Sequence, residues 1–130
     1  MNAPTIDQLR EGKQRHLDYL FARREPLDDA QLWETCFRAQ GVALDTVTRI
    51  RRILSDILEV DLSRIRATDS FSKQLSFFWD IDSLADLKIV HAMEEDFKIT
   101  ISNAEAEAMK TLRDIVLGVH AKIVTSPPSS

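Results

Sequence analysis

The apolar residues of segment 45–59 constrain the fold more than any other feature of the sequence. They recur at intervals of one, three and four residues, and they are Val47, Ile50, Ile53, Leu54, Ile57 and Leu58. Because an α-helix turns once in about 3.6 residues, this spacing places all of them on one face. The segment is therefore predicted to be an amphipathic helix that other elements must cover.

Composition indicates that those other elements are helices too. The 130 residues include only three glycines and four prolines, whereas an all-β chain needs many turns. Hydrophobic residues make up 44% and charged residues 29%, as in folded proteins rather than disordered ones. The length suggests one domain. We therefore expect an all-α bundle.

The same periodicity predicts five further helices. Thr5 or Asp7 suits the start of the first helix and Pro26 its end. The stripe Leu32, Trp33, Cys36 and Phe37 marks the second. The expected ranges are about 5–24, 28–40, 83–97, 103–110 and 111–124.

Residues 60–82 are predicted to form a long loop packed onto the core. Its apolar anchors are Leu62, Ile65, Phe71 and Leu75. The C-terminal residues 126–130 are expected to be disordered.

Net charge, the length of the apolar runs, and the cysteine and histidine residues argue against several classes of function. The net charge of −4 argues against a nucleic-acid partner, because binding phosphate backbones usually requires a basic face. No apolar run approaches the length of a membrane span. The lone Cys36 fits a reducing cytoplasm. His16, His91 and His120 show no metal-ligand spacing, so we expect no metal site.

One short stretch raises a question of function, namely FFWDIDSLADL at residues 77–87. Ser83 lies between Asp82 and an expected helix start, where free backbone N–H groups create a positive potential. That potential favours a phosphate ester on the hydroxyl. Taken alone, the stretch favours a serine that only caps the helix.

Four separated blocks of residues 47–124 closely resemble the bacterial acyl carrier proteins. In chain order the blocks read VTRIRRILSDILEVDLSRI, ATDSF, IDSLADLKIVHAMEEDFKITIS and NAEAEAMKTLRDIV. Their order and spacing are nearly those of the family, and DSL followed by EEDF is the most specific part. The resemblance implies a four-helix bundle with a long first loop.

The resemblance also implies a function without catalysis. Ser83, flanked by Asp82 and Leu84, would carry 4′-phosphopantetheine, transferred from coenzyme A by a phosphopantetheinyl transferase. The thiol of that arm would hold acyl groups as thioesters for acyl-loading and acyl-processing enzymes. Fatty-acid, lipid or polyketide-type biosynthesis is the expected setting, with a cytoplasmic monomer as the carrier.

The resemblance assigns two further sets of residues. Partner enzymes are expected to dock on Asp86, Lys88, Glu94 and Glu95, in a region where carboxylates attract basic patches. The acyl chain is expected to lie among apolar residues that otherwise form ordinary core: Leu84, Leu87, Val90, Ile101, Ala108 and Leu112.

The sequence departs from the family pattern before the serine. Asp80 stands where the family usually has glycine, and a stretch close to SFFW lengthens the loop. Phe77, Phe78 and Trp79 have two open interpretations: they fill the core and tie the loop down, or they form an apolar patch beside the arm that recognises a partner or shields a cargo.

The second departure is an extension that precedes the carrier region. We expect an N-terminal helical extension at 1–44, an acyl carrier domain at 45–125 and a tail at 126–130. The extension reads as a helical hairpin that packs on the bundle, on a second copy or on another protein. Two other functions stay open, an unmodified adaptor or regulator acting through these helices, and an aminoacyl (peptidyl) carrier.

Overall fold

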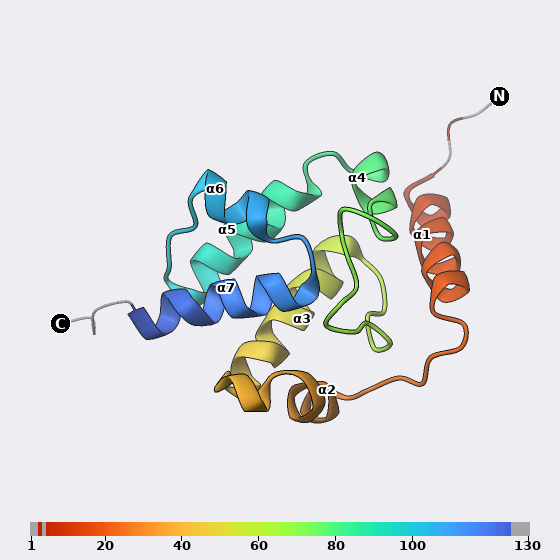
Figure 1. The fold of residues 1–130 in the computed structure, drawn as a ribbon. Coiled ribbons are helices and arrows are strands. Elements are labelled where there is room, and N and C mark those ends of the chain that lie inside the picture. The colour runs from red at the N-terminus through yellow and green to blue at the C-terminus, as the bar shows by residue number, and fades with distance from the viewer. Residues whose placement is uncertain (1–2, 4, 126–130) are drawn as a thin grey trace.

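The computed structural model describes residue 3 and residues 5–125, and the regular elements named in that part of the chain are helices joined by loops (Figure 1). The expected tail at 126–130 lies outside the described residues. The elements are α1 (Ile6–Leu20), α2 (Asp29–Cys36), the 3₁₀ turn η1 (Arg38–Gln40), α3 (Leu44–Leu58), α4 (Phe77–Ile81), α5 (Ala85–Phe97), α6 (Asn103–Ala108) and α7 (Leu112–Thr125).

Helix α3 is the centre of the bundle, and it packs against α5, α2 and α7. Its predicted apolar face is the core: Val47, Ile50, Leu54 and Leu58 are at most 2% exposed, while Ile57 is half-buried. Among the described residues, four helices begin with a reciprocal capping box. The side chain of the capping residue accepts the backbone N–H three residues on, and the side chain of that later residue accepts the N–H of the capping residue; the capping residues are Thr5, Asp28, Ser102 and Thr111. Thr5 thus fulfils the capping role predicted for it.

The second predicted helix is shorter than expected. Helix α2 ends at Cys36, and residues 38–40 continue as the 3₁₀ turn. Gly41 then adopts a left-handed conformation with φ of 78°, which glycine enters without steric cost. Of the apolar stripe, Leu32 and Phe37 are fully buried, and the Trp33 indole donates to the carbonyl of Val42 at 2.6 Å.

The long loop packs on the core at its four predicted anchors, all at most 3% exposed. Its end nevertheless contains helix α4 at residues 77–81, so the loop prediction is wrong there. Phe78 is 1% exposed, and the Trp79 indole donates to the carbonyl of Phe71 at 2.9 Å. A five-residue helix is too short to show a period, and this one forms because its aromatic side chains are buried.

Both helices of the N-terminal extension pack on the bundle of the same chain. They do so at separate places (Figure 1). Helix α1 lies beside α4 and the long loop, whereas α2 packs against α3. The predicted hairpin is therefore an open pair of helices. Helix α1 is held by the buried side chain of Leu17 and by polar contacts: Arg10 pairs with Glu59 at 3.0 Å, and Lys13 donates to the carbonyl of Leu58 at 2.8 Å.

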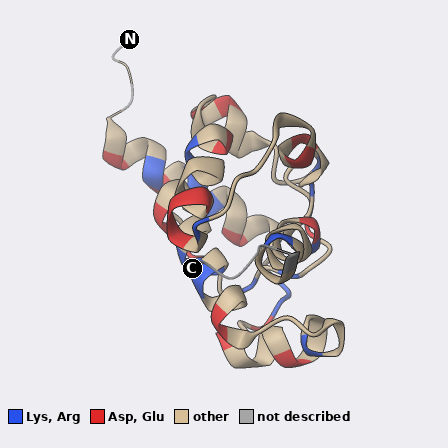
Figure 2. Ribbon diagram, turned by 90° about the vertical axis from the view of Figure 1, so that its left-hand side faces the viewer, with Lys and Arg blue, Asp and Glu red and all other residues tan. Residues whose placement is uncertain are grey.

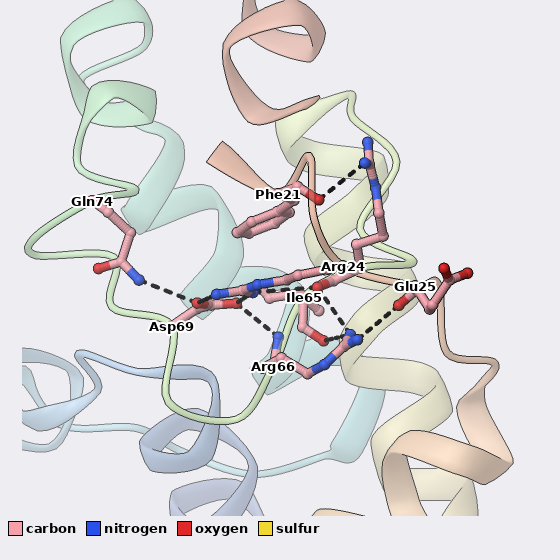
Figure 3. Close-up of polar contacts among 8 residues, drawn as sticks. Phe21, Arg24, Glu25, Ile65, Arg66, Asp69 and Gln74 are labelled. Carbon is pink, nitrogen blue, oxygen red and sulfur yellow. Dashed lines mark hydrogen bonds and ion pairs between the residues drawn. The ribbon is translucent and has the colours of Figure 1, made fainter. Parts of the chain in front are cut away.

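A buried ion pair fixes the chain that leaves α1. The guanidinium of Arg24 donates to both oxygens of Asp69, at 2.6 and 2.9 Å, as Figure 3 shows. Asp69 also accepts from the Arg66 backbone N–H and from the Gln74 amide. Asp69 belongs to the ATDSF block, so a residue of the carrier region holds the extension in place.

Acidic and basic side chains are interspersed along the chain, and many of them pair (Figure 2). No helix within residues 5–125 is both long and apolar enough to cross a membrane. The same part of the chain holds no group of three His, Cys, Asp or Glu side chains placed to bind a metal ion.

Candidate functional site

Ser83 lies on the short turn between α4 and α5. Helix α4 ends with Asp82 as its C-cap, and Leu84 precedes the first residue of α5 without a side-chain cap. Ser83 thus lies two residues before the helix, not in its first turn as the sequence suggested. Neither Ser83 nor Asp82 is the N-cap, and the capping interpretation of the serine does not hold.

Asp82 shapes this turn with both carboxylate oxygens. One accepts the Leu84 backbone N–H at 3.0 Å, and the other accepts the Lys88 ammonium at 2.8 Å. The hydrogen bond from Lys88, followed by that from Leu84, holds the pKa of Asp82 below its ordinary value. The carboxylate therefore stays ionised and keeps the turn closed beside Ser83.

The hydroxyl of Ser83 is exposed and makes no hydrogen bond within the described part of the chain. The other exposed serines of residues 48–117 are Ser72 and Ser102. Ser72 shares a hydrogen bond with Ser70 at 3.0 Å, and Ser102 caps α6 by accepting the Glu105 N–H at 3.1 Å. Ser83 is the exposed serine of this span whose oxygen is free to react.

Asp80 does not strain the backbone before the serine. Within the described residues, the non-glycine residues with positive φ are Glu59 and Lys98, both at helix C-caps. Asp80 lies inside α4 instead. The backbone at Asp80 is therefore not left-handed, and α4 occupies the stretch where the family usually has a glycine.

The carboxylates expected to meet partner enzymes fall into two groups. Asp86 and Glu95 are exposed on α5 and have no ion-pair partner within residues 5–125. Glu94 accepts the backbone N–H of Ile101 at 3.0 Å and is half-buried, so it holds the chain that follows α5. Lys88, which pairs with Asp82, places a positive charge beside the Ser83 turn.

The aromatic residues before Ser83 belong mainly to the core. Phe78 is buried, so its predicted role in docking is wrong. Phe77 packs against Phe78 at 4.3 Å and against the His16 ring of α1 at 4.4 Å between centroids. Together with the indole hydrogen bond of Trp79, these contacts favour the first of the two interpretations, in which the aromatics tie the loop down.

A small apolar cavity lies inside the bundle near the Ser83 turn, with a volume of about 60 Å³. A shallower groove of about 300 Å³ between α5 and α6 adjoins it, and Asp86, Val90 and Ala106 border both. The cavity is lined by Leu54, Phe71, Trp79, Asp86, Ile89, Val90, Met93, Ala106, Met109 and Ile115.

The six residues predicted for the acyl pocket divide among several places. Val90 lines the cavity, and Leu87 and Ile101 line only the α5–α6 groove. Leu84 is 58% exposed beside Ser83, and Leu112 is buried elsewhere in the core. Ala108 lies in a different groove, between α6 and α7.

Sequence reasoning missed most of the wall of the cavity. Trp79, Met93 and Met109 come from α4, α5 and the α6–α7 connection. Their apolar character was visible, but no spacing along the chain shows that separate elements converge on one space. The signal available in the sequence was the apolar periodicity of residues 83–97, in which Met93 or Ala92 is a position that can face inward.

Comparisons with known proteins place this region in a family. Residues 48–117 match the family described as the phosphopantetheine attachment site. The chain is 32% identical to the acyl carrier protein of Helicobacter hepaticus over 60% of its own length and 97% of that protein. It is 29% identical to the acyl carrier protein of Thermosynechococcus vestitus, over 61% of its length and 93% of that protein. The chain is 32% identical to the acyl carrier protein of Cylindrotheca sp., over 61% of its own length and 94% of that protein.

Proposed function

The chain belongs to the phosphopantetheine attachment-site family and is an acyl carrier rather than an enzyme, and from that premise we propose that Ser83 is the residue that carries its 4′-phosphopantetheine. One observation carries this assignment. Ser83 is the exposed serine of residues 48–117 whose hydroxyl has no hydrogen-bond partner in the described chain.

The residues around Ser83 fit a phosphoester. The exposed oxygen is open to a transferase, and the turn held by Asp82 presents it away from the bundle. The N-terminus of α5 and the Lys88 ammonium supply positive potential for a phosphate, an effect worth about 0.3–1 kcal/mol at an exposed helix end. When attached, the group supplies the thiol that holds acyl intermediates.

Partner enzymes are proposed to approach over the exposed carboxylates near the turn. Asp80 and Asp86 are exposed there, Glu95 is exposed toward the C-terminal end of α5, and unpaired carboxylates steer basic patches into encounter. Phosphopantetheinyl transferase and acyl-processing enzymes are the proposed partners. Lys88 makes this surface less acidic, and we propose that it selects for enzymes of a dedicated pathway.

The cargo is proposed to enter between α5 and α6. Leu87, Val90 and Ile101 line the outer groove, and Val90 and Ala106 lead to the inner cavity. A space of about 60 Å³ is only about twice the share of one water molecule in the liquid. The closed cavity therefore holds the end of a short acyl chain, and longer chains require it to widen.

We further propose a class of pathway, a compartment and an oligomeric state for the carrier. It would serve fatty-acid, lipid or polyketide-type biosynthesis, which uses acyl thioesters of this kind, and it would do so as a cytoplasmic monomer. The added helix α4 and the extension at residues 1–44 support a specialised pathway, because they reshape the surface beside Ser83.

The proposal is tested by incubating the purified chain with coenzyme A and a broad-specificity phosphopantetheinyl transferase. Intact mass should rise by one phosphopantetheine arm. Ser83→Ala should stay unmodified, whereas Ser72→Ala, a matched exposed serine, should be modified like the parent. Equal modification of Ser83→Ala would refute the assignment, and no adduct on any variant would favour the adaptor function.

A further inference from the structure

Met109 lies between two separate spaces in the molecule. It lines the inner cavity of about 60 Å³ and also borders a larger groove of about 440 Å³ between α6 and α7. No other residue in the described part of the chain lines both spaces. The side chain of Met109 is therefore the partition between the cavity assigned to the acyl chain and a groove on another side of α6.

Gly118 of α7 makes room for this partition. A β-carbon built at Gly118 would lie 2.8 Å from Cε of Met109 and 3.9 Å from its Cγ. The first distance is too short for two carbon atoms. The end of the Met109 side chain thus rests on the bare backbone of Gly118. A methionine side chain has three rotatable bonds and adapts readily to a changed space, so this partition is movable.

The α6–α7 groove has a largely apolar wall and a polar rim. Ala108, Met109, Leu117 and Ala121 contribute apolar surface. At the rim, Lys122 of α7 pairs with Glu105 of α6 at 2.7 Å. This hydrogen bond, with those from Ser102, lowers the pKa of Glu105 to about 2. The ion pair bridges the two helices over a space suited to hydrocarbon.

We propose that Met109 sets the length of acyl chain that the carrier shelters. Seated against Gly118, it ends the inner cavity, so a short chain stops there. A longer chain displaces the Met109 side chain and continues into the α6–α7 groove along Leu117 and Ala121. The occupant of that groove is the distal end of the carrier's own cargo. This inference rests on the proposed function of the Ser83 arm.

The test uses the full chain with its arm attached and loaded with straight acyl groups from butanoyl to hexadecanoyl. Thioester cleavage by hydroxylamine reports how well each chain is sheltered. In the parent, protection against cleavage should increase with chain length until the chain reaches Met109, and we call the length at which it stops increasing the break. In Met109→Ala the break should move to chains about three methylene groups longer. Each methylene newly buried should change the ratio of sheltered to exposed chain about fourfold.

Two further variants define the direction of the effect. Gly118→Ala should push Met109 toward the cavity and move the break to shorter chains. Met109→Leu, a milder change that keeps the core filled, should move it partway toward longer chains. Gly12→Ala is the matched control, because a β-carbon at this helical glycine meets nothing within 4 Å. Its length profile should equal that of the parent.

A second readout locates the chain directly. A hexadecanoyl group labelled with ¹³C at its terminal methyl should give nuclear Overhauser contacts to the methyl groups of Leu117 and Ala121. Identical length profiles in the parent, Met109→Ala and Gly118→Ala would overturn the proposal, as would a labelled methyl without these contacts. Either result on protein whose arm is verified by mass would leave the assignment of Ser83 intact.

Discussion

The carboxylate of Asp69 shows how a single residue can hold two parts of the chain together. Its side chain is 2% exposed, whereas that of Arg24 is 31% exposed. The cost of burying this charge is offset by four hydrogen bonds, two of them from Arg24 (Figure 3). Removing one partner from such a pair leaves an uncompensated buried charge.

We therefore expect Arg24→Met to lower the free energy of unfolding by about 2–3 kcal/mol, somewhat less than for a fully buried pair. The discount follows from the partial exposure of Arg24 and from the two donors that Asp69 keeps. Urea unfolding followed by circular dichroism measures this change. Arg38→Met, which removes an exposed pair with Glu34, should cost less than about 1 kcal/mol. Equal effects of the two substitutions would contradict the account.

The site residues differ in how far sequence could reveal them. Ser83 was identifiable because its neighbours form a contiguous motif. The burial of Phe78 was not, because an aromatic residue in a short segment has the same local pattern whether it packs inward or outward. The contact of Glu94 was hidden for a similar reason: its carboxylate accepts the backbone N–H of Ile101, and this bond joins two segments whose relative placement only the fold determines.

Helices α1 and α7 each contain one glycine, and the two helical glycines can be compared directly because only their surroundings differ. Gly12 faces open space, whereas Gly118 faces Met109. Replacing glycine by alanine inside a helix favours folding by about 0.5–1 kcal/mol when the new carbon meets no obstacle. At Gly118 this gain is opposed by the displacement of Met109.

Gly12→Ala is thus expected to raise the free energy of unfolding by about 0.5–1 kcal/mol. Gly118→Ala should raise the free energy of unfolding by roughly 1 kcal/mol less than Gly12→Ala does, because the Met109 side chain must leave its preferred position. Denaturant titration of both variants measures the difference. The gap should close when both variants are made in a Met109→Ala background, and a gap that persists there would show that Met109 is not the obstacle.

The elements themselves were predictable to different degrees. The periodic stripes of α3 and α5 indicated long helices, and the structure confirms both helices and the buried face of α3. The face expected to be buried on α5 is partly wrong, because Leu84 and Leu87 are exposed and Ala85, Ile89 and Met93 are buried. Helix α4 carries no period, so its formation depends on contacts of Phe78 and Trp79 with distant residues. The early end of α2 likewise reflects Gly41 and the packing of Phe37, which outweigh a stripe that would permit a longer helix.

At the scale of the whole molecule, we propose that residues 1–44 fold as one unit with the carrier region. Leu17, Phe21, Leu32 and Phe37 of this extension are at most 2% exposed. The hydrogen bonds of Arg10, Lys13 and Arg24 reach the end of α3 and the loop. The sequence left open where the extension packs, because pairs of residues so far apart leave no local pattern.

Deletion of residues 1–43 should therefore lower the melting temperature strongly, because each large buried side chain removed costs about 2–5 kcal/mol. Thermal unfolding followed by circular dichroism measures the loss. Leu17→Ala provides a smaller change at a buried site of α1, and Tyr19→Ala, at a position 79% exposed, is its control. An unchanged melting temperature on deletion would show instead that the extension serves another protein.

The central claim is that this chain bears its cofactor on Ser83, on the turn between α4 and α5. Peptide-level mass spectrometry of the protein isolated from its native cells tests that claim most directly. We predict a phosphopantetheine arm, with or without an acyl group, on the peptide that contains Ser83, and fragment ions that place it on that residue. An arm on another residue, or a Ser83 peptide that is entirely unmodified, would contradict the account.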